Sequence, residues 1–187
     1  MYLETERLIL RPWQEEDREP FAMLNADPEV MRYFPSVLTR EKSDAMIDIA
    51  RERTRTDGFC FSPIEEKATG SFLGFVGLSR PRYAKLLPFD PCVEIGWRLA
   101  GYAWGHGFAT EAARAWIGFG FETLGLDEIV SFTTVTNEPS QRVMQRLGMH
   151  RNPADDFLHP AIEPGHPLEP HVLYRLARND WAQGPTR

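Results

Sequence analysis

A glycine turn directly in front of an amphipathic helix is the feature that most constrains this chain. Residues 104–110 read Trp-Gly-His-Gly-Phe-Ala-Thr, and apolar residues recur at helical spacing over residues 107–124. A helix start leaves its first N–H groups unpaired and carries partial positive charge, while glycines let an anion approach the backbone. The turn therefore predicts that a ligand with phosphate groups binds at the start of this helix.

The segments on either side of this turn and helix are typical of β-strands. Residues 93–97 precede the turn, and residues 128–136 follow the helix. A strand, a helix and a second strand in this order normally form a right-handed crossover, in which the two strands are parallel. Upstream, the strand-like segments 59–61 and 72–78 are separated by turn residues, which predicts an antiparallel meander that leads into the parallel pair.

Shorter elements are expected in the rest of the chain. They are a strand over 6–12 that Pro12 stops, a helix capped by Asp17, a helix opened by Asp27-Pro28, a helix from Thr39 to about Thr56, a helix over 139–147 and a closing strand over 171–177. On the longest of these helices, Met46, Ile49, Ala50 and Arg53 share one face, which we expect to lie on the sheet. The sequence thus predicts an α/β fold with a mixed sheet of about seven strands, flanked by about four to five helices.

Composition favours one domain over residues 1–187, because a chain of 187 residues with 42% hydrophobic content can bury one well-packed core. Lys and Arg number 21 against 27 Asp and Glu, for a formal net charge of -6, so no overall field attracts nucleic acid or an anionic membrane. Two cysteines in apolar stretches, a start without a signal pattern and the lack of a long apolar run predict a cytoplasmic protein outside the membrane.

Residues 150–171 form an irregular segment that contains five prolines and four of the five histidines. A segment this long is unusual as a plain connector, so we interpret it as a loop that faces the substrate. The spacing of its histidines matches no helical pair and no zinc ribbon. The sequence therefore predicts no metal site.

Taken together, these elements, two motifs and the two ends of the fold resemble the GNAT family of acyl-CoA-dependent N-acetyltransferases. The first motif is Gly105-x-Gly107-x-Ala109 after the strand that carries Glu94-Ile95-Gly96-Trp97, and the second is Asn-x-x-Ser at residues 137–140. The opening at residues 5–12 and the closing strand at residues 172–176 are similar to the ribosomal-protein-acetyltransferase-like (RimJ/RimL-like) branch. One departure is Tyr102, where the family often has Gln or Arg. Phosphate binding by main-chain N–H groups survives this change.

The resemblance implies acetyl-CoA as co-substrate and no metal. Residues of the glycine turn would bind the pyrophosphate through their amides, and the strand after Glu94 would pair its backbone with the pantetheine in a splay between the two parallel strands. The residues expected to contact the cofactor are Trp97, Arg98, Leu99, Trp104, Gly105, His106, Gly107, Phe108, Ala109, Thr110, Asn137, Ser140 and Arg142. Arg142 and Arg146 share a helix face, and a solvated face is the alternative interpretation.

Acyl transfer needs a neutral amine, so a carboxylate acting through water is a reasonable general base. Glu94 is the candidate, because burial on a central strand would raise its pKa towards a useful range. The alternative is a glutamate at the rim of the sheet or one paired with an arginine. Asp155, Asp156 and Glu163 are rival candidates from the irregular segment.

The departing thiolate needs a proton donor, and Ser140 or Tyr174 could serve. Ser140 could equally satisfy backbone N–H groups in the first turn of its helix, and Tyr174 could be a packed core tyrosine. A backbone N–H near Ile95 or Trp97 would stabilise the oxyanion that forms during transfer.

The sequence therefore predicts an enzyme, an N-acetyltransferase that moves an acetyl group from acetyl-CoA to a primary amine without a covalent enzyme intermediate. The acceptor is either a protein N-terminus or a small-molecule amine, and a longer acyl donor stays open. A non-catalytic module that binds or senses acyl-CoA is the alternative function. The expected assembly is a monomer or a homodimer.

Overall fold

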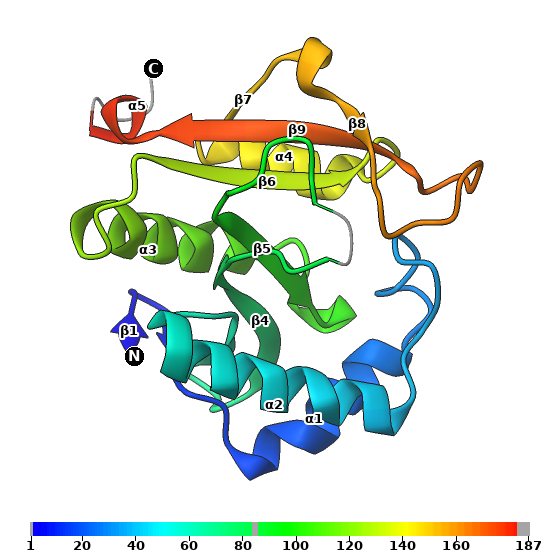
Figure 1. The fold of residues 1–187 in the computed structure, drawn as a ribbon. Coiled ribbons are helices and arrows are strands. Elements are labelled where there is room, and N and C mark those ends of the chain that lie inside the picture. The colour runs from blue at the N-terminus through cyan, green and yellow to red at the C-terminus, as the bar shows by residue number, and fades with distance from the viewer. Residues whose placement is uncertain (1, 84–85, 183–187) are drawn as a thin grey trace. The chain divides into compact units, whose positions relative to one another are not determined.

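The computed structural model describes residues 2–83 and 86–182, which form nine strands and five α-helices (Figure 1). The predicted mixed α/β class is confirmed. The chain divides into two compact units, and β5 (Glu94–Leu99) and α3 (Phe108–Glu122) contribute residues to both. Unit 1 comprises Met1–Ser79 and Gly96–Trp116, and unit 2 comprises Arg80–Ile95 and Ile117–Arg187. The expectation of one domain over 1–187 includes residues outside the described ranges and stays a prediction.

Unit 1 contains the antiparallel meander that the sequence predicts. Its strands β1 (Leu3–Glu4), β2 (Leu8–Leu10), β3 (Ser62–Glu66) and β4 (Phe72–Ser79) pair in chain order. The strand predicted at 59–61 is wrong, because pairing begins only at Ser62, and the strand predicted over 6–12 shortens to β2. Phe59 and Cys60 are buried in the core just ahead of the strand. Their apolar side chains therefore give the same sequence pattern as a buried strand.

Two helices of unit 1 lie side by side, α1 (Arg18–Ala26) and α2 (Arg40–Asp57), shown in blue and cyan in Figure 1. The predicted cap at Thr39 is confirmed, since its Oγ1 accepts a hydrogen bond from Lys42 N at 3.4 Å. The predicted buried face is correct at Ala50 but wrong at Ile49, which is 50% exposed. Ser43 and Ile47 are buried with Ala50 and define the actual face.

The helix predicted to open at Asp27-Pro28 is wrong, because the chain there forms only turns. Asp27 Oδ1 accepts from Glu29 N at 2.8 Å, and Met31 N donates to Asp27 O at 3.0 Å. Pro35 follows within two turns, and so short a segment cannot recover the cost of helix nucleation.

Asp17 precedes α1 as predicted, but its carboxylate does not cap that helix. Its oxygens accept from Arg11 Nη1 at 2.7 Å and Nη2 at 2.8 Å, and Gln14 N donates to it at 2.8 Å. Arg11 Nε also donates to Glu65 at 3.0 Å on β3. This enclosed arginine therefore has two carboxylates as partners, and it joins β2 to the start of α1.

Aromatic rings form much of the core of unit 1. Trp13 and Phe21 have ring centroids 4.9 Å apart, and those of Phe21 and Phe75 are 5.8 Å apart. Trp13 Nε1 donates to Phe61 O at 2.8 Å, so the one polar atom of this ring system is satisfied inside the core.

Unit 2 contains the predicted parallel pair, which is confirmed by Glu94 of β5 opposite Val130 of β6 (Glu128–Thr134). The closing strand β9 (Pro170–Ala177) is antiparallel to β6 from Glu128 opposite Ala177 to Thr134 opposite His171, and the two lie side by side in Figure 1. The helices α4 (Glu138–Arg146) and α5 (Arg178–Ala182) complete this unit. None of the helices in the described ranges is long and apolar enough to cross a membrane.

The irregular segment at 150–171 has more structure than expected. It contains β7 (His150–Arg151), the short 3-10 helix η3 (Pro153–Asp155) and β8 (Phe157–Leu158), and both strands pair with β9. His159 and His171 are buried with ring centroids 4.8 Å apart, and both rings pack at a tilt against Phe132 and Phe157. Burial lowers the pKa of His159 to about 4, so both histidines contribute to packing as neutral rings.

Gly74 of β4 permits an unusually close approach of β5, which generates a stability prediction. Its φ is +133°, and a Cβ there would lie 2.2 Å from Arg98 O and 2.7 Å from Leu99 Cα. We expect Gly74→Ala to lower the free energy of unfolding by roughly 3 kcal/mol or more in urea titrations. Gly70→Ala is the control, because φ is +69° there and nothing lies within 4 Å, so only about 1 kcal/mol is expected. Equal losses would contradict the steric explanation.

Candidate functional site

The glycine turn of unit 1 is open and exposed. Gly105 and Gly107 have φ of +80° and +81°, conformations that favour glycine, and a Cβ on Gly105 would meet nothing within 4 Å. The helix α3 begins at Phe108, and its first bond runs from Glu111 N to Gly107 O at 3.0 Å. The backbone N–H groups of the residues just before Glu111 therefore have no carbonyl acceptor within this helix, and they lie next to the exposed turn.

Arg7, which lies about a hundred residues earlier in the sequence, contacts this turn directly and holds it in place. Its Nη1 donates to His106 O at 3.0 Å, its Nε donates to Glu111 Oε2 at 2.7 Å, and its Cζ lies 4.7 Å from the Phe108 ring centroid. Glu111 also accepts from Thr5 Oγ1 at 2.5 Å and from Arg7 N at 3.0 Å. Burial raises the pKa of Glu111, but these hydrogen bonds outweigh it and lower the pKa overall.

Sequence reasoning missed the role of Arg7. The residue lies in the opening motif at 5–12, but its partner Glu111 is 104 residues away, and no local pattern reveals such a contact. The one available signal is the carboxylate of Glu111 in the first turn of α3, a position where a negative charge is favourable.

Three predicted cofactor residues, Trp97, Arg98 and Leu99, lie on β5 in unit 1. Leu99 O accepts from Trp104 Nε1 at 2.9 Å, so the end of this strand is bonded to the first residue of the glycine turn. Arg98 is 9% exposed. The structure thus brings Leu99 and the turn together, and it encloses the side chain of Arg98.

A second group of predicted residues gathers around α4 in unit 2. Asn137 caps the helix, with Oδ1 accepting from Ser140 N at 3.3 Å and Nδ2 donating to Ser140 Oγ at 3.1 Å. Arg142 is exposed and pairs with Glu138 at 3.2 Å, as the interpretation of a solvated face expects. Asn137 and Ser140 therefore form one hydrogen-bonded corner at the start of α4.

Tyr174 of β9 reaches a different part of α4. The residue is 4% exposed, and its hydroxyl accepts from Gln145 Nε2 at 3.2 Å and donates to Gln141 Oε1 at 3.5 Å. These contacts are those of a packed core tyrosine with a satisfied hydroxyl, the alternative interpretation of this residue.

Glu94 is the first residue of β5 and is partly exposed. Burial raises the pKa of its carboxyl to about 8. Two rival carboxylates are ion-paired instead, Asp155 with Arg175 at 3.2 Å and Asp156 with Arg151 at 2.5 Å, and Glu163 is exposed. The environment of Glu94 thus shifts the pKa of its carboxyl towards the range of a base at neutral pH.

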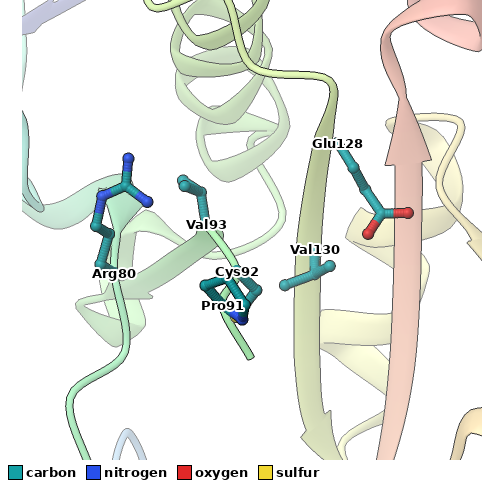
Figure 2. Close-up of a pocket in the computed structure, with 6 residues that line it drawn as sticks. All are labelled: Arg80, Pro91, Cys92, Val93, Glu128 and Val130. Carbon is teal, nitrogen blue, oxygen red and sulfur yellow. The ribbon is translucent and has the colours of Figure 1, made fainter. Parts of the chain in front are cut away.

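A small cavity of about 210 Å³ lies beside the start of β5 in unit 2 (Figure 2). Its lining residues are Arg80, Pro91, Cys92, Val93, Glu128 and Val130, and Figure 2 shows Arg80 and Glu128 on opposite sides of the Pro91–Val93 segment. Glu128 pairs with Arg175 at 2.7 Å. None of the predicted site residues lines this cavity, and its volume is small for a substrate pocket.

Neither cysteine has the properties of a nucleophile. Burial and the neighbouring Asp90 carboxylate raise the pKa of Cys92 to about 12, and burial also raises the pKa of Cys60. Both thiols therefore stay protonated at neutral pH, whereas nucleophilic attack requires the thiolate. In the part of the chain that the structure describes, no three His, Cys, Asp or Glu side chains group as a metal site would require.

Comparisons with known proteins place the chain in a family. The model of the acetyltransferase (GNAT) domain matches residues 7–150. A relative from Aspergillus fumigatus, an FsC-acetyl coenzyme A-N(2)-transacetylase, is 30% identical over 190 residues, which cover 96% of this chain and 77% of the relative.

Two solved structures share the fold. The GNAT-family acetyltransferase from Bacillus anthracis aligns with a TM-score of 0.78 and 24% identity, over 96% of this chain and 99% of that one. The spermidine N-acetyltransferase from Vibrio cholerae, solved with CoA and spermine, aligns with a TM-score of 0.73 and 17% identity, over 95% and 99%. The predicted enzyme class, an N-acetyltransferase, is thus confirmed, and the chain belongs to the GNAT family of acetyltransferases.

Proposed function

We propose that this enzyme moves the acetyl group of acetyl-CoA directly to a primary amine while both substrates are bound. The observation that carries the proposal is the exposed glycine turn of unit 1, which Arg7 and Glu111 hold open at the start of α3. Acetyl-CoA, when bound, supplies the activated acetyl thioester. Resemblance to the RimJ/RimL-like branch supports a protein N-terminus as one acceptor class, and a small-molecule amine is the other.

The backbone of residues 104–110 would bind the cofactor phosphates, because it combines open space at Gly105 with amides at the start of a helix of 15 residues. The backbone of residues 97–99 would pair with the pantetheine, and Asn137 and Ser140 would contact it from α4. Arg142 would exchange its exposed pairing with Glu138 for a cofactor phosphate, since such exposed ion pairs are weak. The splay between β5 and β6 remains a prediction.

Glu94 would act as the general base, taking a proton from the ammonium group through water so that a neutral amine attacks. The raised pKa of its carboxyl, about 8, supports this role, because a base is most effective when its pKa lies near the working pH. Ser140 is the better candidate for the proton donor. Tyr174 is more deeply buried, and its hydroxyl is engaged by two glutamine side chains.

Direct transfer is supported by the state of the thiols. A covalent acyl-enzyme would require a thiolate or an activated hydroxyl, and the pKa of each cysteine lies above its ordinary value. The general base would therefore act on the acceptor amine itself.

The proposed reaction predicts that thiol release from acetyl-CoA requires an amine. We expect calorimetry to detect acetyl-CoA binding, and steady-state thiol release across a panel of amines to rise above the hydrolytic background for at least one. Absence of binding would overturn the whole proposal. Binding without amine-dependent release would instead favour a non-catalytic acyl-CoA module.

The role of Glu94 predicts a pH dependence. Since its carboxyl stays protonated below its pKa, kcat/KM should rise as the pH increases through about 8. We expect Glu94→Gln to lower kcat by roughly a hundredfold or more and to remove this inflection, with acetyl-CoA affinity unchanged. Asp155→Asn is the matched control and should stay close to wild type. An inflection that persists in Glu94→Gln belongs to the acceptor amine and contradicts the assignment.

The contacts of Arg7 predict a defect confined to cofactor binding. Arg7→Gln should raise KM for acetyl-CoA roughly five- to tenfold, corresponding to about 1 kcal/mol, because the turn loses its anchor at His106 and Glu111. Arg55→Gln removes a comparable exposed pair with Glu52 on α2 and serves as the control. A fall in kcat with KM unchanged would show that Arg7 does not position the turn.

A further inference from the structure

Arg98 is a buried cation whose one hydrogen-bond partner in the described chain is neutral. The residue is 9% exposed, and Nη1 donates to Asn25 Oδ1 on α1. Burial lowers the pKa of Arg98 to about 10. Burying a guanidinium is costly unless a carboxylate or an equivalent anion accompanies it. No ion pair involving Arg98 is found within the described ranges.

One edge of this guanidinium lacks an acceptor. Nε is buried without a hydrogen-bond partner, and among the described residues none accepts a bond from Nη2. Nε and Nη2 together form the edge that binds the two oxygens of a carboxylate side by side. The unsatisfied donors therefore match the geometry of a planar anion with two oxygens.

Two other arginines of unit 1 with little side-chain exposure have carboxylates as partners. Arg11, with a side chain 13% exposed, has Asp17 and Glu65 as partners. Arg18, with a side chain 18% exposed, contacts Glu15 at 2.6 Å and Asp48 at 2.7 Å. Arg98 is likewise buried, but its guanidinium has the neutral Asn25 side chain as its hydrogen-bond partner and no carboxylate among the described residues.

The surroundings of Arg98 fix the orientation of its open edge. Its Cζ lies 4.1 Å from the Phe34 ring centroid and 5.5 Å from that of Phe75. Asn25, which holds Nη1, is itself anchored by donating to Ser43 Oγ at 2.8 Å. Phe34 is 38% exposed in the segment between α1 and α2, so the guanidinium is covered by a ring that reaches the surface. The cation is preorganised and close to solvent.

We propose that Arg98 binds a carboxylate of the acceptor, so that the preferred substrates are amines that also carry a carboxylate, as amino acids do. This inference rests on the proposed amine acetylation. Phosphates of acetyl-CoA are assigned to the glycine turn, and a single guanidinium edge among aromatic rings suits a planar carboxylate. Arg98 would thus select the acceptor through its side chain, whereas its backbone belongs to the strand proposed for the pantetheine.

The test compares amines that differ only by a carboxylate. Phenylalanine with phenethylamine and lysine with cadaverine form two such pairs, and kcat/KM is measured for each member by thiol release. We expect wild type to prefer the carboxylate-bearing member of at least one pair, and Arg98→Met to lower that preference roughly tenfold or more. Arg98→Lys, which keeps the charge but loses the two-donor edge, should restore only part of it.

The preference is a ratio within one variant, so a loss of folded protein does not change it. Differences in amine basicity cancel when the ratio of a variant is divided by that of wild type. Arg55→Gln, which removes an exposed arginine paired with Glu52 on α2, is the control and should keep the wild-type preference. Equal rates for both members in wild type, or a preference that persists in Arg98→Met, would overturn this inference while amine acetylation stands. Acetylation of no amine would overturn both.

Discussion

The carboxylate of Glu111 organises the start of α3, and the glycine turn depends on it. Glu111 receives hydrogen bonds from the Thr5 hydroxyl and from the backbone and side chain of Arg7, and Arg7 in turn bonds His106 O inside the turn. A negative charge in the first turn of a helix is favourable in itself. The same carboxylate therefore stabilises the helix and ties the beginning of the chain to the turn, which leaves the turn open at Gly105.

Several ionisable side chains elsewhere in the molecule form ion pairs, which makes the unpaired ones on β5 informative. Asp17, Asp155 and Asp156 all have arginine partners. Glu94 and Arg98, both on strand β5, have no ion-pair partner of opposite charge within the described residues, and burial shifts the pKa of each towards its neutral form. Two unpaired ionisable groups on one strand are costly for stability, and such a cost is typical of residues that are retained for function.

Much of the fold could be predicted because its signals are local. The cap at Thr39, the approximate span of α3 and the parallel orientation of β5 and β6 follow from capping chemistry, apolar period and the handedness of crossovers. The two errors in secondary structure arose where a local pattern also fits another conformation. Phe59 and Cys60 are apolar without belonging to a strand, and Asp27-Pro28 begins a turn that is too short to continue as a helix.

The sequence by itself determined the order of strand, glycine turn, helix and strand, and with it the family and the position of the exposed glycine turn. These features depend on neighbours a few residues apart, so a single sequence contains them. Only the tertiary structure decided which charges are paired. Arg7 and Glu111 are 104 residues apart, and the missing carboxylate beside Arg98 is visible only once α1, β4 and β5 have packed around it. That packing sets burial and long-range hydrogen bonds. These contacts distinguish Arg7, which is paired with Glu111 within the fold, from Arg98, which we propose binds the substrate.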